Sequence, residues 1–579
     1  MHAKIKAILT IGAAMLSSTA FAQSDGNFTI FGGNFSFNGL FRLEAAINTS
    51  DQANRFNQFG DPANGVPIHR EAGNPGTRYT TTLAPTGLGP LTSLIGTSAS
   101  LGTPGRGVSN SLIVSDTITK YAPGRDPDLN YHLARFEISP TLAWRNGWSI
   151  QSRFRLAYDP GDLGYRDFSY QDYADTNGGI TGGDPSLYHG SPNFLGYRTD
   201  DERNPLLFER SGKHYMIDAP ALFVQWTNGN VTARLGNQTI AWGQLLFFRI
   251  MDQANGLDLR RHLFLDRALE EYADERQSAP GLRVTWQTTD TITSDFFVQQ
   301  FIPTILPNTN TPYNVIDTHF TLHDRYTEDG YDNKFNAGVR FRGEYGNYNW
   351  QVMYTNKLDQ IGRIRFTPSG INKKLPETNI LGATFNRYCE GVLGSPSGEG
   401  CGPQLAQLPF EVVPSGLDSA EEWFWGANNQ KLDAVGIFNG IVKDYAPLTT
   451  NLLLIDDGNV VQIANQLNLL FMASEGLRGH IEREYFRENV FGVGAGFVGQ
   501  GEPGSLIDQM LFNLEVAYTP DRLLASPDVR NDPPEVDDLQ VGVVIEKYLR
   551  FSQSFPATYL VFQYMWSKET DLAGLRIDG

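Results

Sequence analysis

The sequence contains little cysteine, few charged residues and no excess of cations. Only 2 of its 579 residues are cysteine, which excludes a disulfide-dense scaffold and most metal sites built from several thiolates. Charged residues make up 19% of the chain, below the roughly 25% of an average globular protein. Basic residues number 46 and acidic residues 64, a net charge of −18, whereas phosphate binding needs clustered cations. We therefore expect no nucleic-acid partner.

Long apolar runs are also missing, and the short one at the N-terminus belongs to a secretory signal. A basic start is followed by an apolar run over residues 7–16 and by Ala-Phe-Ala at 20–22, which fits the small-x-small cleavage rule. This run is too short for a membrane-spanning helix, which needs roughly 20 residues. We predict a cleaved signal peptide over 1–22 and an exported mature chain over 23–579.

The mature chain is rich in alternating apolar and polar residues bounded by tight turns, the pattern of β-strands. Residues 337–357 give the clearest case. The run turns at Gly346-Asn347, and before the turn the apolar Val339 and the polar Arg340 are expected on opposite faces of the strand. Similar runs lie at 135–158, 222–238, 282–301, 511–519, 541–552 and 558–567. Each strand has about 9–12 residues, aromatic residues collect near strand ends, and short turns alternate with long excursions, which favours transmembrane strands.

We therefore predict an all-β fold, a closed antiparallel transmembrane β-barrel of about 14–18 strands. A soluble β-sandwich shows the same alternation and is the alternative. Within lipid every backbone N–H and C=O must be paired, and a sheet achieves this only when it closes on itself and leaves no free edge, so long strands in a membrane favour the barrel. The polar face must then line the lumen, since a midplane arginine facing lipid costs about 2–4 kcal/mol. The lumen or substrate-path candidates are Arg153, Arg155, Arg234, Arg283, Arg340, Arg342, Glu344, Arg260 and Arg261.

Three segments lack sustained alternation. Residues 51–130 and 159–219 are rich in turn-forming residues and are predicted to be long outer loops. Residues 358–479 include two stretches of helical apolar spacing, 419–438 and 460–474. We expect this segment to plug or gate the lumen, with an ordinary extracellular loop domain as the alternative. The plug candidates, which would pack against the inner wall or line a site for an apolar molecule, are Leu453, Leu454, Leu469 and Phe471.

Motifs that carry chemistry are scarce. The chain has no Gly-x-Ser-x-Gly elbow and no phosphate-binding loop, so we expect neither enzyme activity nor a cofactor. His319 and His323 are closely spaced but lack a flanking glutamate pattern, and residues 172–184 lack the spacing of an EF-hand, so we predict no metal site. Cys389 and Cys401 are expected to form a disulfide, as suits an oxidising compartment.

Glycine-containing motifs cluster in the middle of the chain. They are LGNQTIAWGQ at 235–244 and ANGLDLRRH at 254–262, followed by EEY at 270–272 and PGL at 280–282. Together they resemble the bacterial family named domain of unknown function 1302, with the best similarity over about 133–356. The resemblance implies an exported outer-membrane β-barrel and carries over no catalytic or binding residue. Genes of this family often neighbour a second uncharacterised exported family and transporters of the resistance-nodulation-division type, which implies traffic of a hydrophobic or lipid-like compound.

The residues of these motifs also have a local interpretation. The glycines of 236–243 indicate a strand that bends or bulges inward. Arg260 and Arg261 lie near Asp258 and Asp266, so we interpret them as part of an ion-paired loop or helix in the lumen, with a constriction as the alternative.

The predicted function is passage of a hydrophobic or amphipathic small molecule or lipid-like compound across the outer membrane, with lumen arginines orienting an anionic head group. A hydrophilic porin for anionic solutes and a structural or adhesive component of an envelope complex are the alternatives. Expected partners are outer-membrane lipid, a small hydrophobic ligand, and an envelope transporter or exported partner protein. The polar tail 571–579 is unexplained, because outer-membrane proteins often end on an aromatic strand residue.

Overall fold

The computed structural model describes the parts of the chain that form the strands and helices discussed below. It covers residues 28–47, 65–72, 114–119, 129–159, 195–197, 199, 204–212, 214–246, 250–260, 276–307, 316, 320–452, 454–502, 505–549, 558–569, 571–572 and 575–576. The predicted signal peptide, most of the two predicted outer loops, Arg261, His319 and Leu453 lie outside these residues, and the predictions made for them remain predictions.

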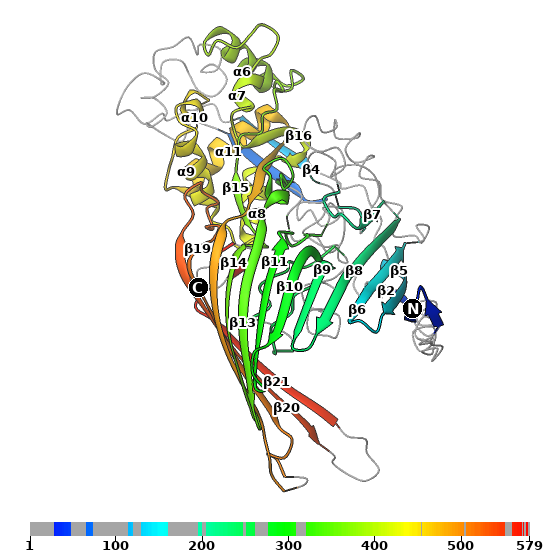
Figure 1. Ribbon diagram of the computed structural model, residues 1–579. Helices are drawn as coiled ribbons and strands as arrows, with labels where there is room; N and C mark the ends of the chain where they lie inside the picture. The colour runs from blue at the N-terminus through cyan, green and yellow to red at the C-terminus, as the bar shows by residue number, and fades with distance from the viewer. Residues whose placement is uncertain are drawn as a thin grey trace, which may run out of the picture.

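One large antiparallel sheet, the main sheet, dominates the described chain (Figure 1). Its 15 strands are β1 (Phe28–Ile30), β2 (Gly33–Ile47), β5 (Leu129–Ala143), β6 (Trp148–Tyr158), β7 (Glu209–Ser211), β8 (Tyr215–Asn228), β9 (Val231–Gln238), β10 (Ala279–Gln287), β11 (Ile292–Gln300), β13 (Phe335–Tyr345), β14 (Tyr348–Leu358), β18 (Arg487–Val498), β19 (Leu511–Leu523), β20 (Glu535–Leu549) and β21 (Thr558–Ser567). The strands pair in chain order from β1 to β21, and β7 pairs with β8 at the side. No pairing joins the two ends of this order among the described residues, so closure stays a prediction.

Tight turns fix the register of neighbouring strands. At the β5–β6 turn Gly147 has φ +86°, and a Cβ there would lie 2.1 Å from the carbonyl oxygen of Thr227, so only glycine fits. At the β13–β14 turn Gly346 also has positive φ, at 57°, and the flanking residues Tyr345 and Tyr348 face each other. The second of these turns is the hairpin that Gly346-Asn347 predicts.

The two faces of the main sheet differ in polarity. Large apolar side chains on one face are exposed, among them Phe341 at 42%, Val352 at 44% and Val493 at 50%. Charged side chains on the other face are buried, as Arg155 at 5% and Asp295 at 1% illustrate. A soluble β-sandwich has the opposite arrangement, because its apolar faces are hidden between two sheets.

The connection between β9 and β10 lies on the charged face of the main sheet. We call residues 239–246 and 250–260 the inner segment; apart from isolated bridges it has no strand or helix. Six of its apolar residues form one core with side chains of β11, β14, β18, β19 and β20. The members of this core from the inner segment are Ile240, Trp242, Leu245, Ile250, Met251 and Ala254, and those from the strands are Phe297, Met353, Val490, Ala517 and Val544. The inward bend predicted near Gly236 is thus followed by a segment packed on the sheet.

The predicted insertion, residues 358–479, folds into a mixed unit that we call the cap. Its elements are β15 (Arg363–Phe366), α6 (Ile380–Gly391), α7 (Gly402–Leu405), β16 (Phe410–Leu417), α8 (Ala420–Asn429), α9 (Ala434–Asp444), α10 (Leu448–Asn451), α11 (Val460–Ser474) and β17 (Leu477–Glu484). β17 pairs antiparallel with β15 and β16 and parallel with β12 (Phe320–His323), which comes from the β11–β13 connection. Figure 1 shows the helices gathered at one end of the main sheet.

The sequence explains where the cap helices begin. Ser419 and Glu422 form a capping box at the start of α8, and the side chains of Asn379, Asp433 and Asn459 accept backbone N–H groups at the starts of α6, α9 and α11. None of the described helices combines the length and the apolar character needed to cross a membrane.

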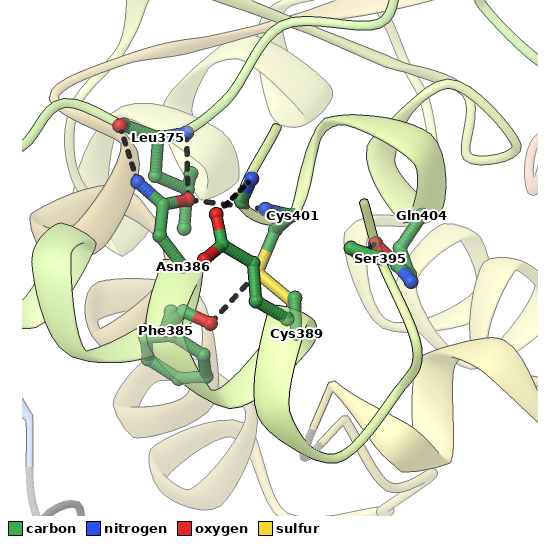
Figure 2. Close-up of a disulfide and its surroundings, with 9 residues drawn as sticks. Leu375, Phe385, Asn386, Cys389, Ser395, Cys401 and Gln404 are labelled. Atoms are coloured by element: carbon green, nitrogen blue, oxygen red, sulfur yellow. Dashed lines mark hydrogen bonds between the residues drawn. A yellow bond between two sulfur atoms is a disulfide. The ribbon is translucent and has the colours of Figure 1, made fainter. Parts of the chain in front are cut away.

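A disulfide between Cys389 and Cys401 ties the end of α6 to the start of α7, as expected (Figure 2). Both cysteines are buried, and Asn386 supports the same loop by accepting the backbone N–H groups of Leu375 and Cys401.

Small elements complete the described structure. They are β3 (Pro67–Ala72), β4 (Val114–Thr119), the 3₁₀ helix η4 (Tyr331–Asn333), β22 (Asp571–Leu572) and β23 (Leu575–Arg576). β3 and β4 form a hairpin that contacts the cap, because Asn468 of α11 donates to the carbonyl oxygen of Glu71.

Two predicted loop boundaries are wrong. The predicted loop over 159–219 is too long, because β7 and the first residues of β8 lie within it. Asp218 and Pro220 interrupt the alternation of apolar and polar residues in β8. The first half of this strand therefore does not show the pattern of a strand in the sequence. The loop over 51–130 likewise contains the β3–β4 hairpin, and β5 begins at Leu129.

Candidate functional site

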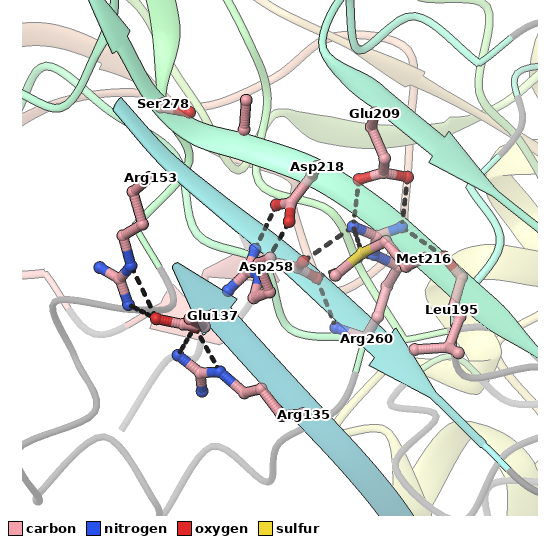
Figure 3. Close-up of polar contacts among 12 residues, drawn as sticks. Arg135, Glu137, Arg153, Leu195, Glu209, Met216, Asp218, Asp258, Arg260 and Ser278 are labelled. Atoms are coloured by element: carbon pink, nitrogen blue, oxygen red, sulfur yellow. Dashed lines mark hydrogen bonds and ion pairs between the residues drawn. The ribbon is translucent and has the colours of Figure 1, made fainter. Parts of the chain in front are cut away.

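The charged face of the main sheet carries ion pairs between neighbouring strands (Figure 3). Glu137 of β5 accepts from Arg135 at 2.5 Å and from Arg153 of β6 at 2.8 Å. The next pair joins Arg155 of β6 to Asp218 of β8, with Arg155 Nε donating to Asp218 Oδ1 at 2.9 Å. The strand register places Arg155 opposite both Glu137 and Asp218. Arg155 bonds its direct partner Asp218, whereas Glu137 bonds Arg153, the diagonal neighbour on β6.

Asp295 of β11 is the centre of a second group. Its carboxylate accepts Arg283 Nε of β10 at 2.9 Å, Arg340 Nη2 of β13 at 3.2 Å and the indole N–H of Trp242 at 3.1 Å. The Arg340 guanidinium also lies over the Trp242 ring, 5.4 Å from its centroid. Two guanidinium groups therefore share one buried carboxylate, which also fixes the inner segment to the sheet through Trp242.

The remaining predicted lumen residues are more exposed. Arg234 of β9 donates to Gln225 at 2.8 Å and lies over the Phe223 ring. Arg342 and Glu344 pair near the end of β13, where their side chains are 41% and 62% exposed. The charged face thus changes from buried pairs near Asp295 to open ones at the β13–β14 turn.

Arg260 ends the described inner segment and is 1% exposed. Its guanidinium donates to Glu209 Oε2 at 2.8 Å, to Asp258 Oδ2 at 2.8 Å and to the carbonyl oxygen of Leu195 at 2.6 Å (Figure 3). Burial opposes its charge, but the carboxylates of Asp258 and Glu209 raise the pKa of Arg260 well above its usual value. Arg260 therefore belongs to an ion-paired loop, the favoured interpretation of its motif.

A small recess lies beside this loop. Its lining includes Glu209, Asp218, Asn237 and Ser278, and its volume of about 30 Å³ has room for about two water molecules. A pocket for a drug-sized molecule has about 300–1,000 Å³. The recess is therefore large enough for ordered water but too small for the hydrophobic or amphipathic molecule that the sequence predicts.

Two acidic residues that the sequence analysis missed hold the backbone of the inner segment. Glu515 of β19 is fully buried and accepts the backbone N–H groups of Gln244 and, at 3.2 Å, Met251. Asp252 accepts the backbone N–H groups of Trp242 and Gly243, each at 2.6 Å. The position of Glu515 on the polar face of a strand is visible in the sequence. Its role is not, because its partners Gln244 and Met251 are more than 260 residues away along the chain.

The plug candidates lie inside the cap. Leu454 and Phe471 are 4% and 1% exposed and belong to a core made of cap residues, Ala72 and Val529, and Leu469 packs against that core. The expectation that these side chains pack against the inner wall is therefore corrected for the three described residues. The segment that packs on the charged face is the inner segment.

The cap also holds a buried polar cluster that the sequence analysis did not assemble. His323 and His480 both face the carboxylate of Glu411. Burial raises the pKa of Glu411, but hydrogen bonds and charge from the two imidazoles lower it to about 2, so this carboxylate is ionised at neutral pH.

Comparisons with known proteins give one informative match. A family model described as "Protein of unknown function (DUF1302)" matches residues 3–566. No curated protein matches.

Solved structures with some similarity are porins and channels. OprB of Pseudomonas putida is 6% identical with a TM-score of 0.26, covering 75% of this chain and 69% of its own. The anion-selective porin of Comamonas acidovorans is 8% identical with a TM-score of 0.23, covering 79% and 83%. The outer-membrane channel DcaP of Acinetobacter baumannii is 7% identical with a TM-score of 0.26, covering 94% and 81%.

Proposed function

The chain belongs to the family described as protein of unknown function (DUF1302), and we propose that it is an outer-membrane β-barrel that passes a hydrophobic or amphipathic compound along its charged inner face. The proposal includes closure of the main sheet, export by the N-terminal signal, and residence in the outer membrane of a bacterial envelope. Acyl chains of that membrane would contact the exposed apolar face.

The observation that carries the proposal is the polarity of the two faces of the main sheet. Val298, Phe491 and Phe562 are 48%, 48% and 62% exposed, although each belongs to a central or paired strand. Monomeric soluble proteins rarely expose contiguous apolar patches beyond a few hundred Å². In a bilayer the same face is satisfied by lipid, and the charged face is satisfied by water and ion pairs.

The inner segment supports a restricted path in preference to an open pore. It lies on the charged face and combines apolar side chains with guanidinium groups of neighbouring strands, as the contact of Trp242 with Arg340 shows. An amphipathic compound needs both kinds of surface, because its apolar part avoids water while its anionic group pairs with arginine. The side chains of Arg153 and Arg342 are 31% and 41% exposed although each pairs with a glutamate, so their exposed N–H groups would remain open to such an anionic group.

A hydrophilic porin for anionic solutes is the second candidate function. The arginines of β6, β9, β10 and β13 favour it, since cationic side chains that line a wet pore attract anions. The two candidates differ in what must cross the membrane. An anion porin conducts chloride in the absence of any lipophilic compound.

Reconstitution separates these functions. The mature chain is placed in planar bilayers for chloride conductance and in liposomes for transfer of a fluorescent long-chain fatty acid to albumin. We expect accelerated transfer of the fatty acid and little steady chloride current. Steady anion-selective current without accelerated fatty-acid transfer contradicts the proposal and supports the porin.

A further inference from the structure

The cluster in the cap brings together residues from three separate parts of the chain. His323 ends β12, Glu411 lies in β16 and His480 lies in β17. The strand pairing explains why their side chains share one face of the small sheet. Glu411 is opposite Arg478, and His323 is opposite Glu482. Residues 478, 480 and 482 of one strand point to the same face, so their partners do as well.

The donor atoms converge closely. His480 Nδ1 lies 3.0 Å from Glu411 Oε1, and His323 Nε2 lies 3.3 Å from the same oxygen. One ligand atom from each residue lies within 4.8 Å of the others. His323, Glu411 and His480 are 5%, 1% and 5% exposed, so the cluster is shielded from bulk water.

Two imidazoles and one carboxylate are a donor set of zinc proteins. Zinc binds histidine nitrogen and carboxylate oxygen at about 2.0–2.2 Å in a tetrahedron, which separates neighbouring donors by roughly 3.4 Å. The two distances to Glu411 are already near that value. The imidazole rings are stacked with centroids 3.9 Å apart and an interplanar angle of 27°, so both must rotate apart to aim their lone pairs at one ion.

We propose that His323, Glu411 and His480 bind one divalent transition-metal ion, with zinc as the natural occupant. Three protein ligands leave one tetrahedral position for water. The ion would join β12, which belongs to the β11–β13 connection of the main sheet, to β16 and β17 of the cap.

The spacing of the ligands explains why sequence reasoning missed this site. The close pair His319 and His323 would suit one helix, but His323 lies on a strand and its partners Glu411 and His480 are 88 and 157 (480 − 323) residues further along the chain. Only the parallel pairing of β12 with β17 brings the two histidines together.

The test measures metal binding by the full mature chain in detergent after treatment with a chelator. Cobalt(II) is titrated and followed by its visible absorption, zinc is used as competitor, and bound metal is counted by mass spectrometry. We expect one ion per chain. His323→Ala, His480→Ala and Glu411→Gln should each weaken cobalt binding tenfold or more. The control is His69→Ala, because His69 is an exposed histidine on β3 that pairs with Glu71.

Absence of stoichiometric binding to the wild-type chain overturns the proposal, and so does binding that the three variants retain. If the variants fail to fold, X-ray absorption of the zinc-loaded wild-type chain decides: two imidazole nitrogens among the ligands support the site, and any other ligand set refutes it. Because none of these measurements involves transport, failure here is distinguishable from failure of the proposed function.

Discussion

The inner segment and the cap are both insertions between strands of the main sheet, yet they are stabilised in opposite ways. The cap has its own helices, three of the four strands of a small sheet, a disulfide and an apolar core drawn almost entirely from its own residues. The inner segment has no strand or helix and shares its core with five strands of the main sheet. The carboxylates of Asp252 and Glu515 accept its backbone N–H groups at residues 242, 243, 244 and 251.

This difference bears on the proposed location in a membrane. Non-helical backbone at membrane depth is tolerated only where protein or water satisfies its polar groups. The inner segment meets that condition through buried acids, so it is the part of the chain suited to narrow a path. The cap needs no such support and lies at the end of the main sheet. Variants of the two regions should therefore affect different properties.

The largest effect is expected from Asp295→Ala in the group that fixes the inner segment. This change leaves the guanidiniums of Arg283 and Arg340, 16% and 13% exposed, without their shared carboxylate. Removing one partner of a buried ion pair costs about 3–5 kcal/mol. We expect a loss of that order in the free energy of unfolding, measured by urea titration in detergent. Glu344→Ala is the matched control, because its pair with Arg342 is exposed, and an equal loss there contradicts the account.

A somewhat smaller effect is expected from Glu515→Ala. Two backbone N–H groups of the inner segment lose their acceptor, and each buried unsatisfied group costs about 1–3 kcal/mol. We expect the free energy of unfolding to fall by about 2–4 kcal/mol and chloride conductance in planar bilayers to rise as the segment detaches. Glu515→Gln keeps one acceptor oxygen, so its free energy of unfolding and its conductance should lie between those of the wild type and of Glu515→Ala. Unchanged conductance in a folded Glu515→Ala protein would show that the inner segment does not restrict the path.

In the cap, the double change of Cys389 and Cys401 to serine should act locally. A disulfide typically contributes about 2–4 kcal/mol by restricting the unfolded chain, and one closing a short loop lies at the lower end. We expect faster proteolysis between α6 and α7, followed by mass spectrometry of the fragments. Conductance and fatty-acid transfer should stay at wild-type values. A change in either would mean that the cap and the inner segment are not independent.

The smallest effect is expected from Ser419→Ala at the start of α8. It removes one half of the capping box, at a cost of about 1 kcal/mol. Amide hydrogen exchange in the first turn of α8 should accelerate about fivefold, since this free energy sets the local opening equilibrium. Exchange in β13 and β14 serves as the internal reference, and a matching change there would contradict local stabilisation of the cap.

Local features of the fold were predictable from the sequence. The alternation of Val339 and Arg340 and the turn at Gly346 identify a hairpin, because side-chain direction and turn conformation depend on neighbouring residues. Helical spacing likewise identified the α8–α9 region and α11.

What could not be predicted depends on contacts between distant residues. Asp218 interrupts the pattern of β8 because it pairs with Arg155, which only the strand register reveals. The place of the inner segment depends on Glu515, and the cap cluster depends on the parallel pairing that brings His323 to His480. Hydrophobic spacing carries no information about such partners.

The central claim is that one face of the main sheet meets lipid and the other meets a wet path. It is tested most directly by spin labels at Phe341→Cys and Arg342→Cys, adjacent residues of β13 that point to opposite faces of the sheet and are both at least partly exposed. In liposomes, we expect the label at 341 to collide mainly with oxygen, which concentrates in lipid, and the label at 342 mainly with a water-soluble nickel complex. Equal accessibility of the two labels to both reagents would contradict the claim.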